Sequence, residues 1–329
     1  MCLSQSVVSN ILPRKYVFST FESVHGLISF TEDCNRIVVW NPSINQHVTI
    51  PVPENSRIGQ IYLGYDPCGD TYKLLWIPEL SEYYSNNDYD GVWVLTLGAE
   101  ESWRIIEGST TMYGLRGSWK CISGVMYYIV LPIPSNNPDG SKITIMSFNV
   151  RFETFKPIKF PCCGDNFPRG EHYLLSYHGR LALVCSLATK LWILEDEKEE
   201  KWVCNIDLHL PTHRMDPTKK INYQLSDATV TGEFIYLALA EDDKEIHILY
   251  YDPKKNSTRI FKFEESMYKE FEGFGGGGCK FDIPDEMCLF AYGEPNLTGL
   301  TYAWRFARCY PNHIENLISL KNITYSKLA

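Results

Sequence analysis

The segment LLSYHGRLALVC at Leu174–Cys185 is followed by LWILED at Leu191–Asp196 and KWVCNIDL at Lys201–Leu208. Each of these segments is short and apolar, and each is bounded by polar or glycine-containing residues. Such runs are typical of antiparallel β-strands. The dipeptide His178-Gly179 divides the first segment and predicts a tight turn between two strands. Together the segments predict a small antiparallel sheet.

The same order of segments recurs along the chain. A glycine opens the middle strand of the repeat at four places, and the third strand ends in a large apolar residue five times. These third-strand positions are Trp40, Leu97, Phe148, Leu194 and Tyr251, which gives a period of about 50 residues, close to that of a β-propeller blade. We expect the five residues to occupy equivalent, mostly buried positions. Two β-sandwich domains remain the alternative, because periodicity defines strands better than it defines ring closure.

The composition supports an all-β chain. The 329 residues include 21 Tyr, 16 Phe, 8 Trp, 18 Pro and 22 Gly, a balance that favours short strands and tight turns over long helices. The formal net charge is −9, and no basic cluster is present. Nucleic acid is therefore not expected as the main partner, because binding to it depends on neutralising phosphates.

The sequence shows no feature that is typical of a membrane-spanning or secreted protein. No run of about 18 apolar residues predicts a membrane span, and MCLSQSVVSNILPRKY at the start lacks the apolar core of a signal peptide. The 11 cysteines include no C-x-x-C pair, which is typical of thiols in a reducing compartment. We therefore expect an intracellular protein, cytoplasmic, nuclear or both, with no membrane partner.

Two patterns resemble ligand sites but fail tests of context. Gly273, Gly275 and Gly278 satisfy G-x-G-x-x-G, yet a dinucleotide site needs a strand before this motif and a helix after it. Cys204, His209 and His213 have a spacing compatible with zinc, but a fourth ligand is not evident and Pro211 would break a helix carrying both histidines. We expect no cofactor and no metal.

Catalytic residues are not expected either. Adjacent Cys162 and Cys163 would point to opposite faces of a strand, as ordinary thiols. His25 and His178 each precede a glycine that opens a strand, which predicts a role in a turn rather than in catalysis. Five tryptophans at repeated strand positions are interpreted as packing residues between blades: Trp40, Trp93, Trp103, Trp192 and Trp202.

Nine motifs in one order carry a resemblance to a known family. Among them are SVHGLISF (Ser23–Phe30), VVWNPSINQHVTIPVP (Val38–Pro53), YLGYDPCGDTYKLL (Tyr62–Leu75), SFNVRFETFKPIKFP (Ser147–Pro161) and YYDPKKNSTRI (Tyr250–Ile260). The chain resembles the F-box-associated interaction domain, type 1 or type 3, of plant F-box proteins. The resemblance runs from about Ser23 to about Leu320.

The resemblance implies a fold and a domain organisation. The implied fold is an all-β, β-propeller-like ring, similar to kelch and galactose-oxidase propellers, with about six short antiparallel blades and an N-terminal blade that is incomplete. Residues 1–20 form a short segment without a recognisable F-box. Residues 21–322 form the propeller-like domain, and residues 323–329 form a C-terminal tail.

The resemblance also implies a function. In this family an N-terminal F-box docks on the Skp adaptor of a cullin-type ubiquitin ligase, and the associated domain holds the substrate. The implied function is non-catalytic recognition of a protein substrate whose identity is unknown. Because no F-box is recognised in Met1–Thr20, we expect no direct binding to a Skp-type adaptor. A propeller-scaffold enzyme, a carbohydrate-binding protein and a non-functional truncated paralogue remain alternatives.

Two loops combine length with residues suited to contact a partner. These loops are Ser81–Asp90 and Glu270–Cys279. Aromatic residues are effective interface anchors, because they bring a large area with few rotatable bonds. The candidate contact residues are Tyr83, Tyr84, Tyr89, Phe271 and Phe274.

Overall fold

The structure is a computed structural model, and its described residues are almost entirely in strands or the turns between them. The described residues are 22–33, 35–44, 46–54, 56, 59–78, 91–99, 102–107, 115–130, 143–161, 172–185, 190–205, 213–216, 221–239, 245–264, 269–270, 279–280, 288–295, 302–310 and 320. They form 25 strands. Within these ranges no α-helix occurs, and so no helix that could cross a membrane. The predicted domain limits, at residues 20–21 and 322–323, lie outside the described residues.

The strands form antiparallel sheets in chain order. Blade 1 consists of β1 (Ser23–Val24), β2 (Leu27–Asp33), β3 (Arg36–Asn41) and β4 (Gln46–Pro51). Blade 2 consists of β5 (Gly59–Asp66), β6 (Thr71–Pro78), β7 (Trp93–Thr96) and β8 (Arg104–Ile105). Blade 3 consists of β9 (Leu115–Ile122), β10 (Val125–Val130), β11 (Thr144–Asn149) and β12 (Thr154–Lys159).

The next two blades follow the same plan, with one additional strand. Blade 4 consists of β13 (His172–Tyr177), β14 (Arg180–Cys185), β15 (Leu191–Asp196) and β16 (Lys201–Asn205). Blade 5 consists of β17 (His213–Asp216), β18 (Ile221–Ala228), β19 (Phe234–Leu239), β20 (Glu245–Asp252) and β21 (Ser257–Glu264). A last sheet consists of β22 (Lys269–Glu270), β23 (Cys279–Lys280), β24 (Cys288–Pro295) and β25 (Tyr302–Tyr310).

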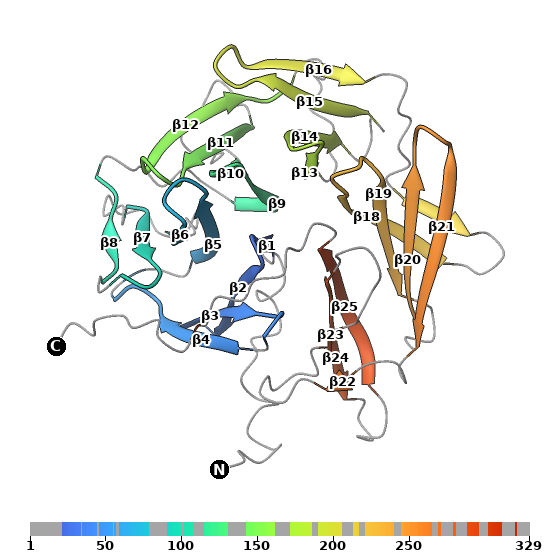
Figure 1. Ribbon diagram of the computed structural model, residues 1–329, viewed down its shortest axis with the longest axis horizontal. Coiled ribbons are helices and arrows are strands. Elements are labelled where there is room, and N and C mark those ends of the chain that lie inside the picture. Colours follow the sequence, from blue (N-terminus) through green and yellow to red (C-terminus); the bar gives the residue numbers. More distant parts are fainter. Residues whose placement is uncertain are drawn as a thin grey trace, which may run out of the picture.

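The sheets are arranged around a common axis (Figure 1). Strands β1, β5, β9, β13 and β18 lie on the inside of the ring, and each contacts the next. This arrangement is a β-propeller and not a pair of β-sandwich domains, because the sheets follow one another around a centre instead of packing in two layers.

The last sheet departs from the plan of the five blades. Its first two strands have two residues each, and its final strand β25 contacts β18 and β19 of blade 5. The five regular blades place an early strand, not the final one, on the inside. The expected ring of about six equivalent blades is therefore not confirmed.

The register of the repeat is confirmed by strand pairing at three of the five predicted positions. Trp40 pairs with Ile28, Phe148 with Met126 and Tyr251 with Phe234. In each case the partner lies two residues after the glycine that opens the second strand. Trp40, Phe148 and Leu194 are buried, whereas Leu97 and Tyr251 are half-buried. The repeat read from the sequence is thus a repeat of three-dimensional positions.

The hydrophobic cores lie between blades. One core joins blades 1, 2 and 3, a second joins blades 3 and 4, and a third joins blades 4 and 5. Trp103 Nε1 donates a hydrogen bond to the Pro51 carbonyl of blade 1, and Trp202 Nε1 donates one to the Lys159 carbonyl of blade 3, each at 2.9 Å. These two tryptophans therefore connect neighbouring blades, as the sequence predicted.

A residue from the C-terminal part of the chain completes the first of these cores. Leu320 is 2% exposed and packs within the core of blades 1 to 3. Its backbone N–H donates a hydrogen bond to Gln46 Oε1 of β4, at 3.1 Å. The first blade is thereby held by a residue that lies 274 positions further along the chain.

Candidate protein-binding face

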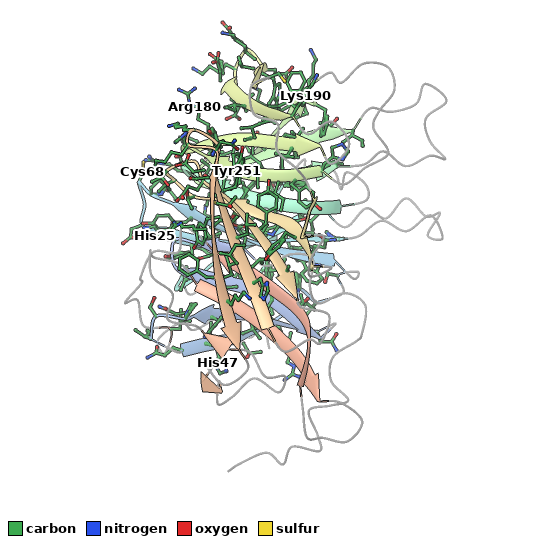
Figure 2. The ribbon with its side chains drawn as sticks, turned by 90° about the vertical axis from the view of Figure 1, so that its right-hand side faces the viewer. His25, His47, Cys68, Arg180, Lys190 and Tyr251 are labelled. Carbon is green, nitrogen blue, oxygen red and sulfur yellow. The ribbon has the colours of Figure 1, made fainter. Side chains whose placement is uncertain are left out.

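Blades 1 to 5 place their short turns at one end of the ring, which we call the turn face. It contains the connections between β1 and β2, β5 and β6, β9 and β10, β13 and β14, and β18 and β19, and those between the last two strands of blades 3, 4 and 5. Figure 2 shows the labelled residues His25, Cys68 and Arg180 toward one side of the molecule and Lys190 toward the other. Among the described residues, the turn face is the end where neighbouring blades meet through their turns.

Three of the inner turns share one backbone conformation. The residue pairs His25-Gly26, Ser123-Gly124 and His178-Gly179 have positive φ at both positions, with values of 47° and 85°, 49° and 82°, and 49° and 72°. Positive φ at both central residues is the geometry of the two-residue turn that matches the twist of antiparallel strands. The role in turns predicted for His25 and His178 is confirmed.

Both histidines also contact the neighbouring blade. The His25 ring stacks on Tyr65 of blade 2 at a centroid distance of 4.0 Å, and its backbone carbonyl accepts a hydrogen bond from Tyr72 Oη. His178 Nδ1 lies 3.1 Å from the Val230 carbonyl of blade 5. The described partners of these imidazoles are therefore aromatic rings, a tyrosine hydroxyl and a carbonyl, which is a packing arrangement.

The outer turns of blades 3, 4 and 5 are built by one repeated hydrogen-bond pattern. Asn149 Oδ1 accepts from the N–H groups of the residues two and three positions later, and Asp196 and Asp252 do the same in their blades. The residue that ends each turn has positive φ, and these residues are Glu153, Glu200 and Asn256. Because the side chain replaces part of the backbone hydrogen bonding, the turn geometry is fixed locally.

Glu153 connects the outer turn of blade 3 to blade 2. Its Oε1 accepts hydrogen bonds from Lys73 Nζ on β6 and Arg104 Nη2 on β8, both at 2.6 Å. Burial raises the pKa of this carboxyl, but the hydrogen bonds and charges of Arg104 and Lys73 outweigh burial, so its pKa lies below the ordinary value. The carboxylate is therefore ionised and engaged at neutral pH.

Glu197 makes the corresponding connection from blade 4 to blade 3. Its carboxylate accepts hydrogen bonds from Tyr127 Oη at 3.0 Å and Ser147 Oγ at 3.1 Å, and its carbonyl accepts one from Lys156 Nζ. Burial, together with the nearby Glu197 charge, raises the pKa of Tyr127, so its hydroxyl remains a donor. Acidic residues at two consecutive outer turns thus bind back to the preceding blade.

A buried ion cluster lies where three inner strands meet the turn face. Lys120 on β9 has 5% side-chain exposure, and its Nζ lies 2.6 Å from Asp227 Oδ2 on β18 and 2.8 Å from Glu22 Oε2, just before β1. Burial lowers the pKa of Lys120, but Asp227 and Glu22 outweigh this effect and the pKa is raised. The cluster joins blades 1, 3 and 5 through one charged amine.

The sequence reading missed this cluster. Lys120 occurs in a mixed segment, SWKCI, that gives no sign of the burial of the lysine. Two carboxylates near the axis are a feature that we would expect of an enzyme, but both are engaged by Lys120 and neither side chain exceeds 13% exposure. The described cluster therefore holds blades together and offers no accessible acid or base.

The predicted contact residues Tyr83, Tyr84, Tyr89, Phe271 and Phe274 lie outside the described residues, so they stay predictions. The same holds for Gly273, Gly275 and Gly278, for Cys162 and Cys163, and for His209. In the described part of the chain, no group of three or more His, Cys, Asp and Glu residues could hold a metal ion. There Cys204 is a free thiol, and so are Cys68 and Cys121. Burial raises the pKa of Cys121 to about 12, so this thiol is protonated at neutral pH.

Comparison with known proteins assigns the chain to a class and then to a family. The class is that of β-propellers. The family model described as the F-box associated beta propeller domain matches residues 3–288. The chain therefore belongs to the F-box-associated β-propeller family, and the resemblance seen in the sequence is confirmed.

Curated relatives from Arabidopsis thaliana agree with this assignment. "Putative F-box protein At4g21240" is 34% identical over 323 residues, covering 94% of this chain and 69% of the relative. "Putative F-box protein At1g47790" is also 34% identical, covering 94% of this chain and 72% of the relative. Among solved structures, the polysaccharide lyase Uly1 gives a TM-score of 0.42 at 8% identity, covering 90% of this chain and 82% of the lyase.

Proposed function

We propose that this chain is a substrate-recognition module of a Skp–cullin–F-box ubiquitin ligase and acts by binding protein, without catalysis. The observation that carries the proposal is the family match over residues 3–288, together with relatives named as F-box proteins. The rigid turn face supports it, because turns anchored to neighbouring blades give a pre-organised surface for a partner. We place the site of action inside the cell, and the free thiols of Cys68, Cys121 and Cys204 agree with a reducing compartment.

The finer features of the fold are part of the same proposal. We propose that β22–β25 acts as a sixth blade and that the ring is related to kelch propellers. The contact of β25 with β18 and β19 supports a place for this sheet beside blade 5. We also propose that the propeller itself does not dock on the Skp-type adaptor. In this family that role belongs to the F-box module.

Purification of the protein from native tissue tests the proposed function. The tissue is treated with a proteasome inhibitor, and the proteins recovered with the chain are compared with those that accumulate in plants lacking its gene. We expect one or more proteins to appear in both sets, accompanied by cullin-ligase subunits that an F-box module, and not the propeller itself, connects to the complex. If a protein appears in both sets but no ligase subunit is recovered, the proposed ligase role is wrong and the proposed protein-binding role stands. Recovery of neither would overturn both.

Purified components test adaptor docking separately. The chain and a Skp-type adaptor are mixed and analysed by size-exclusion chromatography with light scattering. We expect two separate species. A one-to-one complex would show that Met1–Thr20 or the propeller contains a docking element.

A further inference from the structure

The outer turn of blade 3 carries an exposed aromatic side chain. Phe152 is 69% exposed, the largest exposure among the exposed large hydrophobic residues that the structure describes. An isolated exposed apolar residue is common on protein surfaces and by itself means little. However, the outer turns of blades 4 and 5 have the same hydrogen-bond pattern. They therefore show whether this turn requires a phenylalanine.

The repeat shows that the turn does not need phenylalanine. The N–H of Phe152 donates to Asn149 Oδ1, and the N–H groups of Glu199 and Lys255 make the same bond to Asp196 and Asp252. These three residues therefore hold equivalent positions in blades 3, 4 and 5. Two of the three are charged and the turn forms equally well. The aromatic ring of Phe152 thus has no role in forming the turn.

The turn of blade 3 is held in place from three directions. Val150 is fully buried against Gly64 of blade 2, so closely that a Cβ added at Gly64 would lie 2.6 Å from it. The N–H of Glu153 donates to the Asn149 carbonyl at 2.8 Å, and the Glu153 carboxylate binds blade 2. Phe152 therefore projects from a fixed backbone. A side chain presented in this way loses little conformational freedom when a partner covers it.

The charges around Phe152 are mostly positive, although the whole chain carries −9. The Arg151 guanidinium lies over the Phe152 ring, 5.6 Å from its centroid. Glu153 holds Lys73 and Arg104 beside the turn, and the Arg104 side chain is 48% exposed. Two cations thus bind the Glu153 carboxylate, and a third, Arg151, lies on the same turn beside Phe152. This local charge attracts acidic groups, and a ring with an arginine over it provides an apolar surface beside them.

We propose that Arg151 and Phe152 form a docking point for an acidic segment of a partner protein, in which apolar side chains that pack on the Phe152 ring are flanked by Asp or Glu. This inference rests on the proposed function, because it names one contact surface of the protein-binding module. Arg151 and Arg104 provide the charge that selects the segment, and Phe152 provides the apolar contact. Arginine and aromatic residues are enriched among the residues that dominate binding energy at interfaces.

Selection from a random peptide library displayed on phage tests the proposal. The library is selected on the intact chain and depleted on the variant Phe152→Lys, which places at residue 152 the amino acid found at position 255. We expect the enriched peptides to contain apolar residues flanked by Asp and Glu. A synthetic copy should bind Phe152→Lys roughly tenfold or more weakly than the unchanged protein. Arg151→Gln should bind several-fold more weakly, with less sensitivity to salt.

Two controls separate binding from folding. Lys255→Ala alters the equivalent position in blade 5 and should leave peptide affinity unchanged. Phe152→Lys and Phe152→Glu should both keep the melting temperature of the unchanged protein, because the equivalent turns carry these residues. A loss of affinity in Lys255→Ala equal to that in Phe152→Lys would overturn the proposal.

Other outcomes assign the surface differently. Selected peptides that lack acidic residues, or that bind Phe152→Lys unchanged, would overturn the inference. A dimer that dissociates on Phe152→Lys, seen by light scattering, would replace the acidic partner with a second copy of this chain. If the purification from native tissue is repeated with Phe152→Lys and recovers the same partners, the proposed function stands and this inference is wrong.

Discussion

The Lys120 cluster and the Glu153 bridge are opposite in charge and different in environment. At Lys120 one cation lies between two carboxylates, and at Glu153 one carboxylate lies between two cations. All three side chains of the Lys120 cluster are at most 13% exposed, whereas in the Glu153 bridge Lys73 and Glu153 are 13% and 16% exposed and Arg104 is 48% exposed. Both connect different blades through contacts of 2.6–2.8 Å.

This difference teaches that burial, more than distance, determines what an ion pair contributes. A buried charge whose partner has been removed is stabilised neither by water nor by an opposite charge. Near the surface, water reaches a charge that has lost its partner and screens it. The charge–charge distances are nearly equal at the two sites. Removal of the central charge, Lys120 or Glu153, should nevertheless lower the free energy of unfolding by different amounts.

The largest effect is expected for Lys120→Met. The variant leaves Glu22 and Asp227 buried without their cation, and we expect the free energy of unfolding to fall by about 3–5 kcal/mol. Denaturation in urea measures the change. The matched control is the triple variant K120M/E22Q/D227N, which removes all three charges and should recover a large part of the loss. A loss below about 1 kcal/mol for Lys120→Met alone would show that the cluster is solvated, in contrast to the burial of the three side chains.

A smaller effect is expected for Glu153→Gln. The amide keeps the shape of the side chain but removes the charge that Lys73 and Arg104 share. We expect a loss of roughly 1 kcal/mol in the free energy of unfolding, because water screens the half-exposed Arg104. The same urea denaturation gives this value. A loss equal to that of Lys120→Met would mean that exposure does not distinguish the two sites.

The pH dependence should separate the two sites further. The pKa of Glu153 is lowered from 4.5 in the folded protein, so its contribution is present above that value and is lost as the pH falls through the folded pKa. The stability difference between the unchanged protein and Glu153→Gln should therefore narrow in acid. Lys120 has a raised pKa, so its own titration removes stability only in alkali, above the ordinary value of 10.5. Thermal melts of both proteins across the acid range test this.

No measurable effect is expected for Lys255→Ala. Lys255 pairs with Asp252 at 3.1 Å, but its side chain is 79% exposed. Water and salt screen such a pair, and the lysine gives up rotamer freedom when it forms. Melting curves of the variant and the unchanged protein should coincide. A clear shift would indicate that the outer turn of blade 5 depends on more than the Asp252 side chain.

The sequence predicted the repeat well because the repeat depends on local rules. Glycine after His25 and His178 marks turns with positive φ, and Asn149 and Asp252 precede the outer turns that they close. Each of these signals acts within a few residues, so one sequence suffices to read it.

The remaining features depend on residues that are far apart in the sequence. The Lys120 cluster joins residues 22, 120 and 227, and no local pattern distinguishes Lys120 from a surface lysine. The packing of β25 against β18 and β19 is similarly non-local. The role proposed for Phe152 likewise depends on the hydrogen bonds that make its turn equivalent to those of Glu199 and Lys255 in other blades. In the sequence, the motif SFNVRFETF carries the family resemblance and does not single out Phe152.

The position of Leu320 affects the order in which the chain can reach its final state during synthesis. Hairpins such as β9–β10 need only neighbouring residues and can form as soon as these leave the ribosome. The core of blades 1 to 3, by contrast, receives Leu320 as a side chain with 2% exposure. This core therefore lacks one of its buried side chains until residue 320 has been translated. The early blades therefore wait longest for a contact that their core needs, and they are available to chaperones and to misassembly during that time.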